Sequence, residues 1–128
     1  MSELTIGLIG VGKMGGYHLE TWEKIQTARV VAIAESNETV ARERIARRPI
    51  DWHQDYRQLL ERSDIDAVCI TTPSGSHAQI TLDAIAAGKH VFVEKPIATA
   101  LEDGLRMASA ARLAGLKLMV GHVERFNP

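Results

Sequence analysis

Short runs of apolar residues alternate along the chain with longer segments in which apolar residues recur at helical spacing. The apolar runs cover residues 4–9, 29–34, 66–71, 90–94 and 117–121. β-Branched residues are frequent in them and polar ones rare, which is typical of parallel strands covered on both faces. A weaker strand is expected near residues 50–52, where a proline and polar neighbours interrupt the pattern. The alternation predicts an α/β fold, a doubly wound parallel sheet of the Rossmann type in a single domain.

Two of the helical segments have an apolar face that we expect to pack on this sheet. These faces are Met14, His18, Leu19, Trp22 and Ile25 in the first segment and Leu101, Leu105, Ala108 and Ala111 in the last. Thr99 and Asp55 are each followed three residues later by Glu or Gln, which predicts a helix N-cap at both positions. Gly88 and Gly115 stand where the end of a helix favours glycine.

Composition excludes several classes of function. The chain has 128 residues, 45% of them hydrophobic and 24% charged, with a formal net charge of −1. This balance gives no electrostatic reason to bind nucleic acid or an anionic membrane. No apolar run approaches the ~20 residues that span a bilayer, and the N-terminus has no signal-peptide pattern, so we expect a cytoplasmic protein. The single cysteine, Cys69, lies in an apolar run and is expected to be a buried core residue.

Candidate chemistry begins immediately after the first predicted strand. Residues 10–15 read Gly-Val-Gly-Lys-Met-Gly, a G-x-G-x-x-G pattern that opens a helix. In a dinucleotide-binding turn, Gly10 makes the tight turn, Gly12 lets the backbone approach a pyrophosphate and Gly15 lets the helix pack on the strand. The helix N-terminus at Lys13 and Met14 then offers free N–H groups to the phosphates. Glycines alone also mark ordinary turns, so the pattern needs its context.

Glu35 supplies that context, because it ends the second predicted strand twenty residues after Gly15. A carboxylate there accepts hydrogen bonds from the adenosine ribose and repels a 2′-phosphate, which favours NAD over NADP. The nearest arginines, Arg42 and Arg44, are interpreted as surface residues of the next helix. A solvated glutamate at the end of a strand is the alternative for Glu35.

Further ordered motifs identify a family. After the glycine pattern and Glu35 come "DYRQLLERSDIDAV", "TPSGSH", "AGKHVFVEKP" and a closing "RFNP". With these pieces the whole chain resembles the N-terminal dinucleotide-binding domain of the glucose–fructose oxidoreductase/inositol dehydrogenase/MocA family. The ending "GHVERFNP" is most similar to members that act on nucleotide-linked sugars, such as UDP-N-acetylglucosamine 3-dehydrogenases.

The resemblance implies roles for five further residues. It places the backbone of Thr72 and Pro73 along the cofactor and His77 near the nicotinamide, although an exposed or helix-capping histidine is the alternative. It also places Glu94 beside the nicotinamide ribose. Lys95 would both contact the cofactor and act as the catalytic residue, orienting the substrate hydroxyl and favouring loss of its proton. A surface lysine before a turn proline is the alternative for Lys95.

The resemblance also divides the chain into two parts. Residues 1–121 would form the dinucleotide-binding domain, and residues 122–128 would begin the crossing into a second, α+β substrate domain that this chain lacks. His122 and Arg125, with Glu124 between them, would then lie at the substrate edge or simply tie down the connection. No metal is expected.

The function implied is hydride transfer between NAD and a hydroxyl of a sugar, nucleotide sugar or cyclitol, with the chain alone inactive and the full-length form a homo-oligomer. A non-catalytic NAD-sensing module on the same fold is the alternative, and a lysine at position 95 favours the enzyme.

Overall fold

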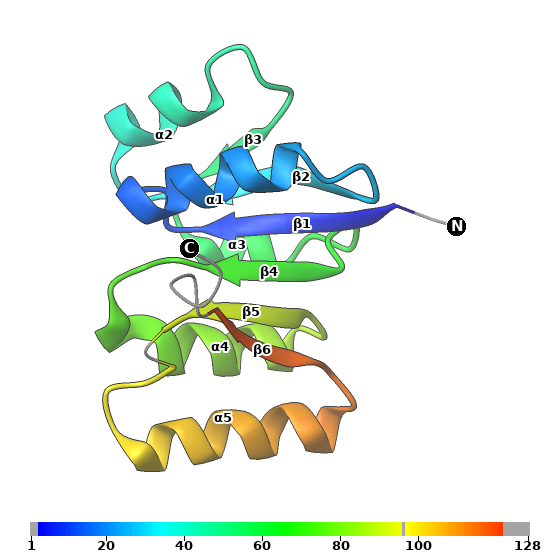
Figure 1. The fold of residues 1–128 in the computed structure, drawn as a ribbon, viewed down its shortest axis with the longest axis vertical. Helices are drawn as coiled ribbons and strands as arrows, with labels where there is room; N and C mark the ends of the chain where they lie inside the picture. Colours follow the sequence, from blue (N-terminus) through cyan, green and yellow to red (C-terminus); the bar gives the residue numbers. More distant parts are fainter. Residues whose placement is uncertain (1–2, 96, 122–128) are drawn as a thin grey trace, which may run out of the picture.

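Six parallel strands form one sheet in the computed structural model, which describes residues 3–95 and 97–121 (Figure 1). The strands are β1 (Leu4–Ile9), β2 (Ala28–Ala34), β3 (Asp51–His53), β4 (Ala67–Ile70), β5 (His90–Glu94) and β6 (Leu118–Gly121). Their order across the sheet is β3-β2-β1-β4-β5-β6, and each neighbouring pair is parallel. All five predicted strands are therefore confirmed, and the weaker one is β3, one residue later than expected.

Helices cover both faces of the sheet. Helices α1 (Lys13–Glu23) and α2 (Glu38–Ile45) lie on one face, while α3 (Tyr56–Leu60), α4 (His77–Ala86) and α5 (Leu101–Ala114) lie on the other, with a short 3-10 turn, η1 (Ser74–Ser76), before α4. Alternation along β1 shows how the strands serve both layers, because Ile6 and Leu8 pack under α1 and α2 whereas Ile9 faces the opposite core. Rossmann-type topology is confirmed.

The single cysteine is buried in the core between the sheet and helices α1 and α2, as predicted. Cys69 has no exposed surface and is a free thiol. Burial raises the pKa of this thiol to about 12, so it stays protonated at neutral pH. Cys69 is thus a small core residue of β4.

Helix ends agree with the sequence at three of four positions. The Asp55 carboxylate caps α3 by accepting a hydrogen bond from the Arg57 N–H at 2.9 Å. Gly115 ends α5 with φ 70°, and Gly88 follows α4 with φ 80°, both in the left-handed region. The cap predicted at Thr99 is wrong, because α5 begins at Leu101 and its N-cap, Ala100, makes no side-chain hydrogen bond.

The predicted apolar faces are only partly buried. His18 and Leu19 are buried in α1 as expected, but Met14 and Ile25 are exposed. In α5 the prediction is wrong for Leu101, Leu105 and Ala108, which are exposed. The buried side of that helix carries Met107 and Ala111 instead. Ala111 belongs to both the predicted and the observed buried face. Periodicity alone therefore does not decide how the helix is rotated about its axis.

Candidate functional site

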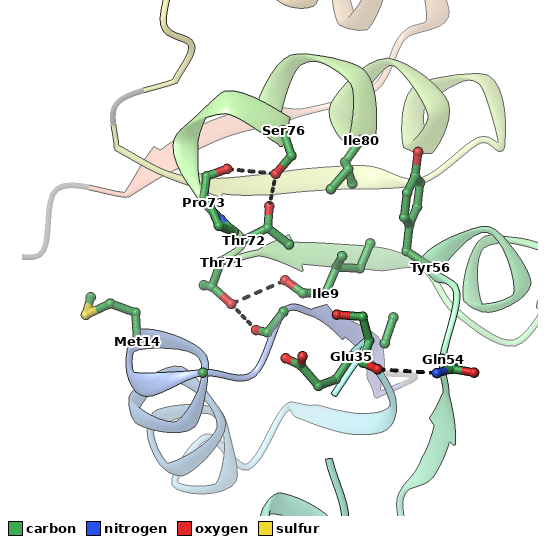
Figure 2. A pocket seen from close by; sticks show the side chains of 14 residues that line it. Ile9, Met14, Glu35, Gln54, Tyr56, Thr71, Thr72, Pro73, Ser76 and Ile80 are labelled. Atoms are coloured by element: carbon green, nitrogen blue, oxygen red, sulfur yellow. Dashed lines mark hydrogen bonds between the residues drawn. The ribbon is translucent and has the colours of Figure 1, made fainter. Parts of the chain in front are cut away.

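A cavity of about 560 Å³ opens at the carboxyl ends of β1, β2 and β4. This edge includes the point between β1 and β4 where the strand order reverses, which is where open α/β sheets bind ligands. Six of the predicted site residues line the cavity: Gly10, Gly12, Met14, Glu35, Thr72 and Pro73. The fold thus brings together residues that are up to 63 positions apart in the sequence (Figure 2).

The three glycines meet different requirements. Gly10 has φ 85°, and a Cβ atom there would lie 2.9 Å from the backbone nitrogen of Thr72. A Cβ atom on Gly15 would lie 2.1 Å from the Gly10 carbonyl oxygen, so only glycine lets α1 approach the loop this closely. Around Gly12, by contrast, a Cβ atom would meet nothing within 4 Å. The first two glycines are needed by the fold, whereas Gly12 leaves open space on the cavity side.

The glycine loop is fixed by the strands on either side of β1. The Gly10 N–H donates to the Ala34 carbonyl of β2 at 2.8 Å. From the end of β4, the Thr71 hydroxyl donates to the Gly10 carbonyl, and the Thr71 N–H donates to the Ile9 carbonyl at 2.9 Å. These hydrogen bonds hold the loop conformation, and a loop held in this way lowers the entropic cost of binding a ligand.

Glu35 is half-buried, and its carboxylate is oriented by the backbone. One oxygen accepts the Val11 N–H at 2.9 Å, and the other accepts the Asn37 N–H at 3.0 Å. The Trp52 ring N–H donates to the Glu35 carbonyl at 2.9 Å and so fixes the main chain as well. Glu35 is thus neither disordered nor merely solvated, and it lines the cavity beside the glycine loop (Figure 2).

Sequence reasoning missed the far wall of the cavity. Tyr56 from α3, Ile80 from α4 and Gln54 line it, and Figure 2 shows Tyr56 and Ile80 on the side opposite Met14. The Tyr56 hydroxyl donates to the Asp83 carboxylate at 2.5 Å. Burial, and then this hydrogen bond, raise the pKa of Tyr56. Ile80 and the Tyr56 ring give this wall an apolar surface, and Gln54 adds a polar group, as is usual in pockets for small molecules.

His77 is buried, so the exposed alternative is wrong, whereas its place near the nicotinamide stays a prediction. It begins α4 but is 1% exposed, and its Nε2 atom lies 2.8 Å from the Thr72 carbonyl oxygen. Ser76 supports the same turn, because its hydroxyl lies 2.7 Å from the Thr72 hydroxyl and from the Pro73 carbonyl. His77 therefore supports the turn that forms one side of the cavity and does not line the cavity itself.

Glu94 and Lys95 lie at the same edge of the sheet, two strands away from β1. Glu94 is 7% exposed, and its Oε1 atom lies 3.3 Å from Nε2 of His18 in α1. Among the described residues, nothing hydrogen-bonds to its Oε2 atom. Lys95 is exposed in the bend that follows β5. Neither residue, nor the exposed Lys13, lines the cavity.

Three residues predicted near the substrate edge lie outside the part of the chain that the structure describes. They are His122, Glu124 and Arg125, in residues 122–128. Within residues 3–95 and 97–121, no three His, Cys, Asp or Glu side chains gather as a metal ion would need. In the same ranges no helix has the length and apolarity of a membrane span.

Known proteins resemble the chain over nearly its full length. It is 39% identical to inositol 2-dehydrogenase of Gluconacetobacter diazotrophicus, over 97% of the chain and 38% of that protein. Scyllo-inositol dehydrogenase of Lactobacillus casei, solved with bound NAD(H) and scyllo-inositol, superposes with a TM-score of 0.91 at 31% identity over 98% of the chain and 38% of its own. The WlbA dehydrogenase of Chromobacterium violaceum, solved with NADH and UDP-GlcNAcA, gives 0.93 at 31% identity over 99% of the chain and 37% of its own.

The chain thus spans somewhat over a third of the length of these relatives. A family model described as "Oxidoreductase family, NAD-binding Rossmann fold" matches residues 4–122. The sheet order, the glycine loop and the acid that ends β2 agree with that description. The chain belongs to this oxidoreductase family, as its NAD-binding Rossmann domain.

Proposed function

We propose that the chain binds NAD in the cavity at the carboxyl edge of the sheet and forms the cofactor half of an oxidoreductase. The observation that carries this proposal is the Glu35 carboxylate, which two backbone N–H groups hold beside the glycine loop. In this position it accepts hydrogen bonds from the adenosine ribose hydroxyls. The open space at Gly12 leaves room for the diphosphate, and the wall formed by Tyr56 and Ile80 suits the adenine.

The reaction that we propose is oxidation of a CH–OH group of a sugar, nucleotide sugar or cyclitol, or the reverse. In this reaction NAD held in the cavity would supply the acceptor for the hydride of the alcohol carbon. The hydroxyl proton must leave at the same time, and Lys95 after β5 is the group that we assign to orient that hydroxyl and, in its neutral amine form, to receive its proton. The neighbouring Glu94 supports this assignment. Its side chain is buried and pairs with His18, which holds the end of β5 directly before Lys95.

Substrate binding requires more chain than the structure contains. Hydride transfer needs the reacting carbon held about 3–3.5 Å from the nicotinamide. The relatives bind their substrates with proteins more than twice as long as this chain. We therefore propose that the second part of a two-domain protein follows residue 121 and closes the site. We also propose that the full-length protein is a cytoplasmic homo-oligomer.

Kinetics of the longer protein test the proposal. The 128-residue chain should bind NAD in calorimetric titration without oxidising any sugar, and the chain extended by its native downstream sequence should turn over a sugar, nucleotide sugar or cyclitol. In the extended protein, Lys95→Met should lower kcat by on the order of 10² and leave NAD affinity nearly unchanged. The matched control is Lys117→Met, in the connection between α5 and β6.

Three results would contradict parts of this proposal. Dehydrogenase activity from the 128 residues alone would refute the two-part site. Full activity of the Lys95→Met variant would remove the proton-transfer role from Lys95. NAD binding without turnover by the extended protein on any alcohol would favour the NAD-sensing alternative.

A further inference from the structure

A cation from α2 rests on the glycine loop. The Nε atom of Arg44 donates to the Val11 carbonyl at 2.9 Å, and Nη2 lies 3.4 Å from the Gly12 carbonyl. The guanidinium group packs against Gly16, where a Cβ atom would lie 2.8 Å from its central carbon. Arg44 is half-buried. The interpretation of Arg44 as a plain surface residue is therefore wrong.

These contacts constrain the peptide groups that face a ligand. In a trans peptide the N–H points away from the C=O of the same unit. Arg44 holds the Val11 carbonyl toward α2, and it holds the Gly12 carbonyl together with the Gly16 N–H of α1, which donates to that carbonyl at 2.8 Å. The N–H groups of Gly12 and Lys13 therefore point away from these contacts. Both lie at the start of α1, where N–H groups have no acceptor within the helix. Gly12 lines the cavity. The loop therefore presents donors on the side where an anion can approach.

Charges of opposite sign hold the two sides of Val11. Its N–H donates to the carboxylate of Glu35 from β2, and its carbonyl accepts from the guanidinium of Arg44 from α2. Arg48 also contacts the main chain of Arg44, because its guanidinium donates to the Arg44 carbonyl at 2.5 Å. Hydrogen bonds thus hold the first turn of the dinucleotide motif from both sides. The positive charge of Arg44 lies beside the N–H groups at the start of α1.

We propose that Arg44 is a positioning residue for the cofactor diphosphate. It acts through the loop, by fixing the Val11 and Gly12 carbonyls so that the adjacent N–H groups face the phosphates, and its charge favours the anion at short range. This inference rests on the NAD-binding function proposed above and names a residue that the glycine motif does not contain. Because Arg44 is occupied by the loop, it is not free to receive a 2′-phosphate, which adds to the preference for NAD set by Glu35.

The test compares ligands with and without a diphosphate on variants of the 128-residue chain. ADP-ribose is titrated by calorimetry and adenosine by ligand-observed NMR. Arg44→Met should weaken ADP-ribose binding by about tenfold or more, as expected for lost charge-assisted hydrogen bonds, and change adenosine affinity by less than about twofold. Arg44→Lys should lie between, because it keeps the charge but cannot fork between two carbonyls.

Arg42→Met is the matched control. Arg42 lies two residues earlier on the same helix, pairs with Glu38 at 2.6 Å and stacks over Trp52, without touching the loop. Its substitution should leave the affinity for both ligands unchanged. In the Arg44→Met variant alone, the backbone amide signals of Gly12 and Lys13 should shift or broaden in the absence of ligand.

Each outcome decides the inference. If Arg44→Met binds ADP-ribose as well as Arg42→Met does, Arg44 does not position the diphosphate. If adenosine and ADP-ribose weaken equally while the melting temperature falls, the contact only stabilises the fold and the inference is overturned. If the unaltered chain binds no NAD, the proposed function fails and this inference with it. Binding by the unaltered chain with no effect at Arg44 overturns the inference alone.

Discussion

The two ends of the proposed site differ in how completely this chain builds them. At the glycine loop, residues at the ends of β2 and β4 and Arg44 of α2 hydrogen-bond to backbone atoms of Gly10 and Val11, and Glu35 has a partner for each oxygen. At the end of β5, one oxygen of the Glu94 carboxylate pairs with His18, and the other has no hydrogen-bond partner among the described residues. The first end is held by hydrogen bonds within this chain. The second holds, within the residues that the structure describes, a buried carboxylate oxygen without a hydrogen-bond partner.

The largest effect is expected from closing the open space at the loop. Gly12→Val should abolish NAD binding, because its side chain would stand between the loop N–H groups and the diphosphate. The fold should persist, since a Cβ at Gly12 meets nothing within 4 Å. Calorimetric titration and circular dichroism measure the two results.

Two control variants sharpen that test. Gly75→Val also adds a side chain in open space near this edge, but outside the cavity lining, and should bind NAD normally. Gly15→Val should unfold the domain, because its Cβ would lie 2.1 Å from the Gly10 carbonyl oxygen. Retained NAD affinity in Gly12→Val would mean that the loop is only a structural turn.

A smaller effect should follow from removing the His18 side chain that pairs with Glu94. His18→Leu leaves a buried carboxylate without its partner and should lower the free energy of unfolding by about 1–3 kcal/mol. Urea denaturation measures this change. Adding Glu94→Leu to His18→Leu should recover part of the loss, because no buried charge then remains. A double variant whose loss equals the sum of the two single losses would show that the pair does not interact.

Cofactor preference should change by a still smaller amount. NAD should bind the chain more tightly than NADP does, because the Glu35 carboxylate repels a 2′-phosphate. Glu35→Ala should narrow the ratio of the two dissociation constants by about tenfold, the equivalent of one modest hydrogen bond or charge contact. Equal or tighter binding of NADP by the unaltered chain would contradict the role of Glu35.

The smallest effect is expected at the far wall of the cavity. Tyr56→Phe removes the hydrogen bond to Asp83 and should cost about 1 kcal/mol of stability near neutral pH. Because burial raises the pKa of Tyr56, the unfolded chain releases the phenol proton before the folded protein does. Stability should therefore fall above about pH 10, and part of that fall should be missing in the variant. Urea denaturation near neutral pH and above about pH 10 measures this fall in stability. If stability changes with pH identically in the variant and the unaltered chain, the raised pKa of Tyr56 is contradicted.

Several features of the site could be predicted from local pattern alone. The strand runs, the glycine loop and Glu35 were all found because each is encoded by neighbouring residues or by a fixed spacing along the chain. His77 was expected near this edge, but its buried contact with the Thr72 carbonyl was not, because a histidine at the start of a helix is compatible with several orientations. The prediction that Leu101 and Leu105 of α5 lie in the core is wrong for a related reason. The helix carries two apolar stripes, and the one with Met107 is buried.

The sequence by itself determined the order of the elements, and with parallel strands this order brings the glycine loop and Glu35 to one edge of the sheet. Only the tertiary structure decided which distant side chains complete that edge. Arg44 reaches Val11 across 33 positions, and His18 meets Glu94 across 76. Periodicity reports whether a residue faces the core or the solvent, but not which residue it contacts there. Those contacts depend on how α1 and α2 dock on the sheet, and docking is decided by the packing of both cores together.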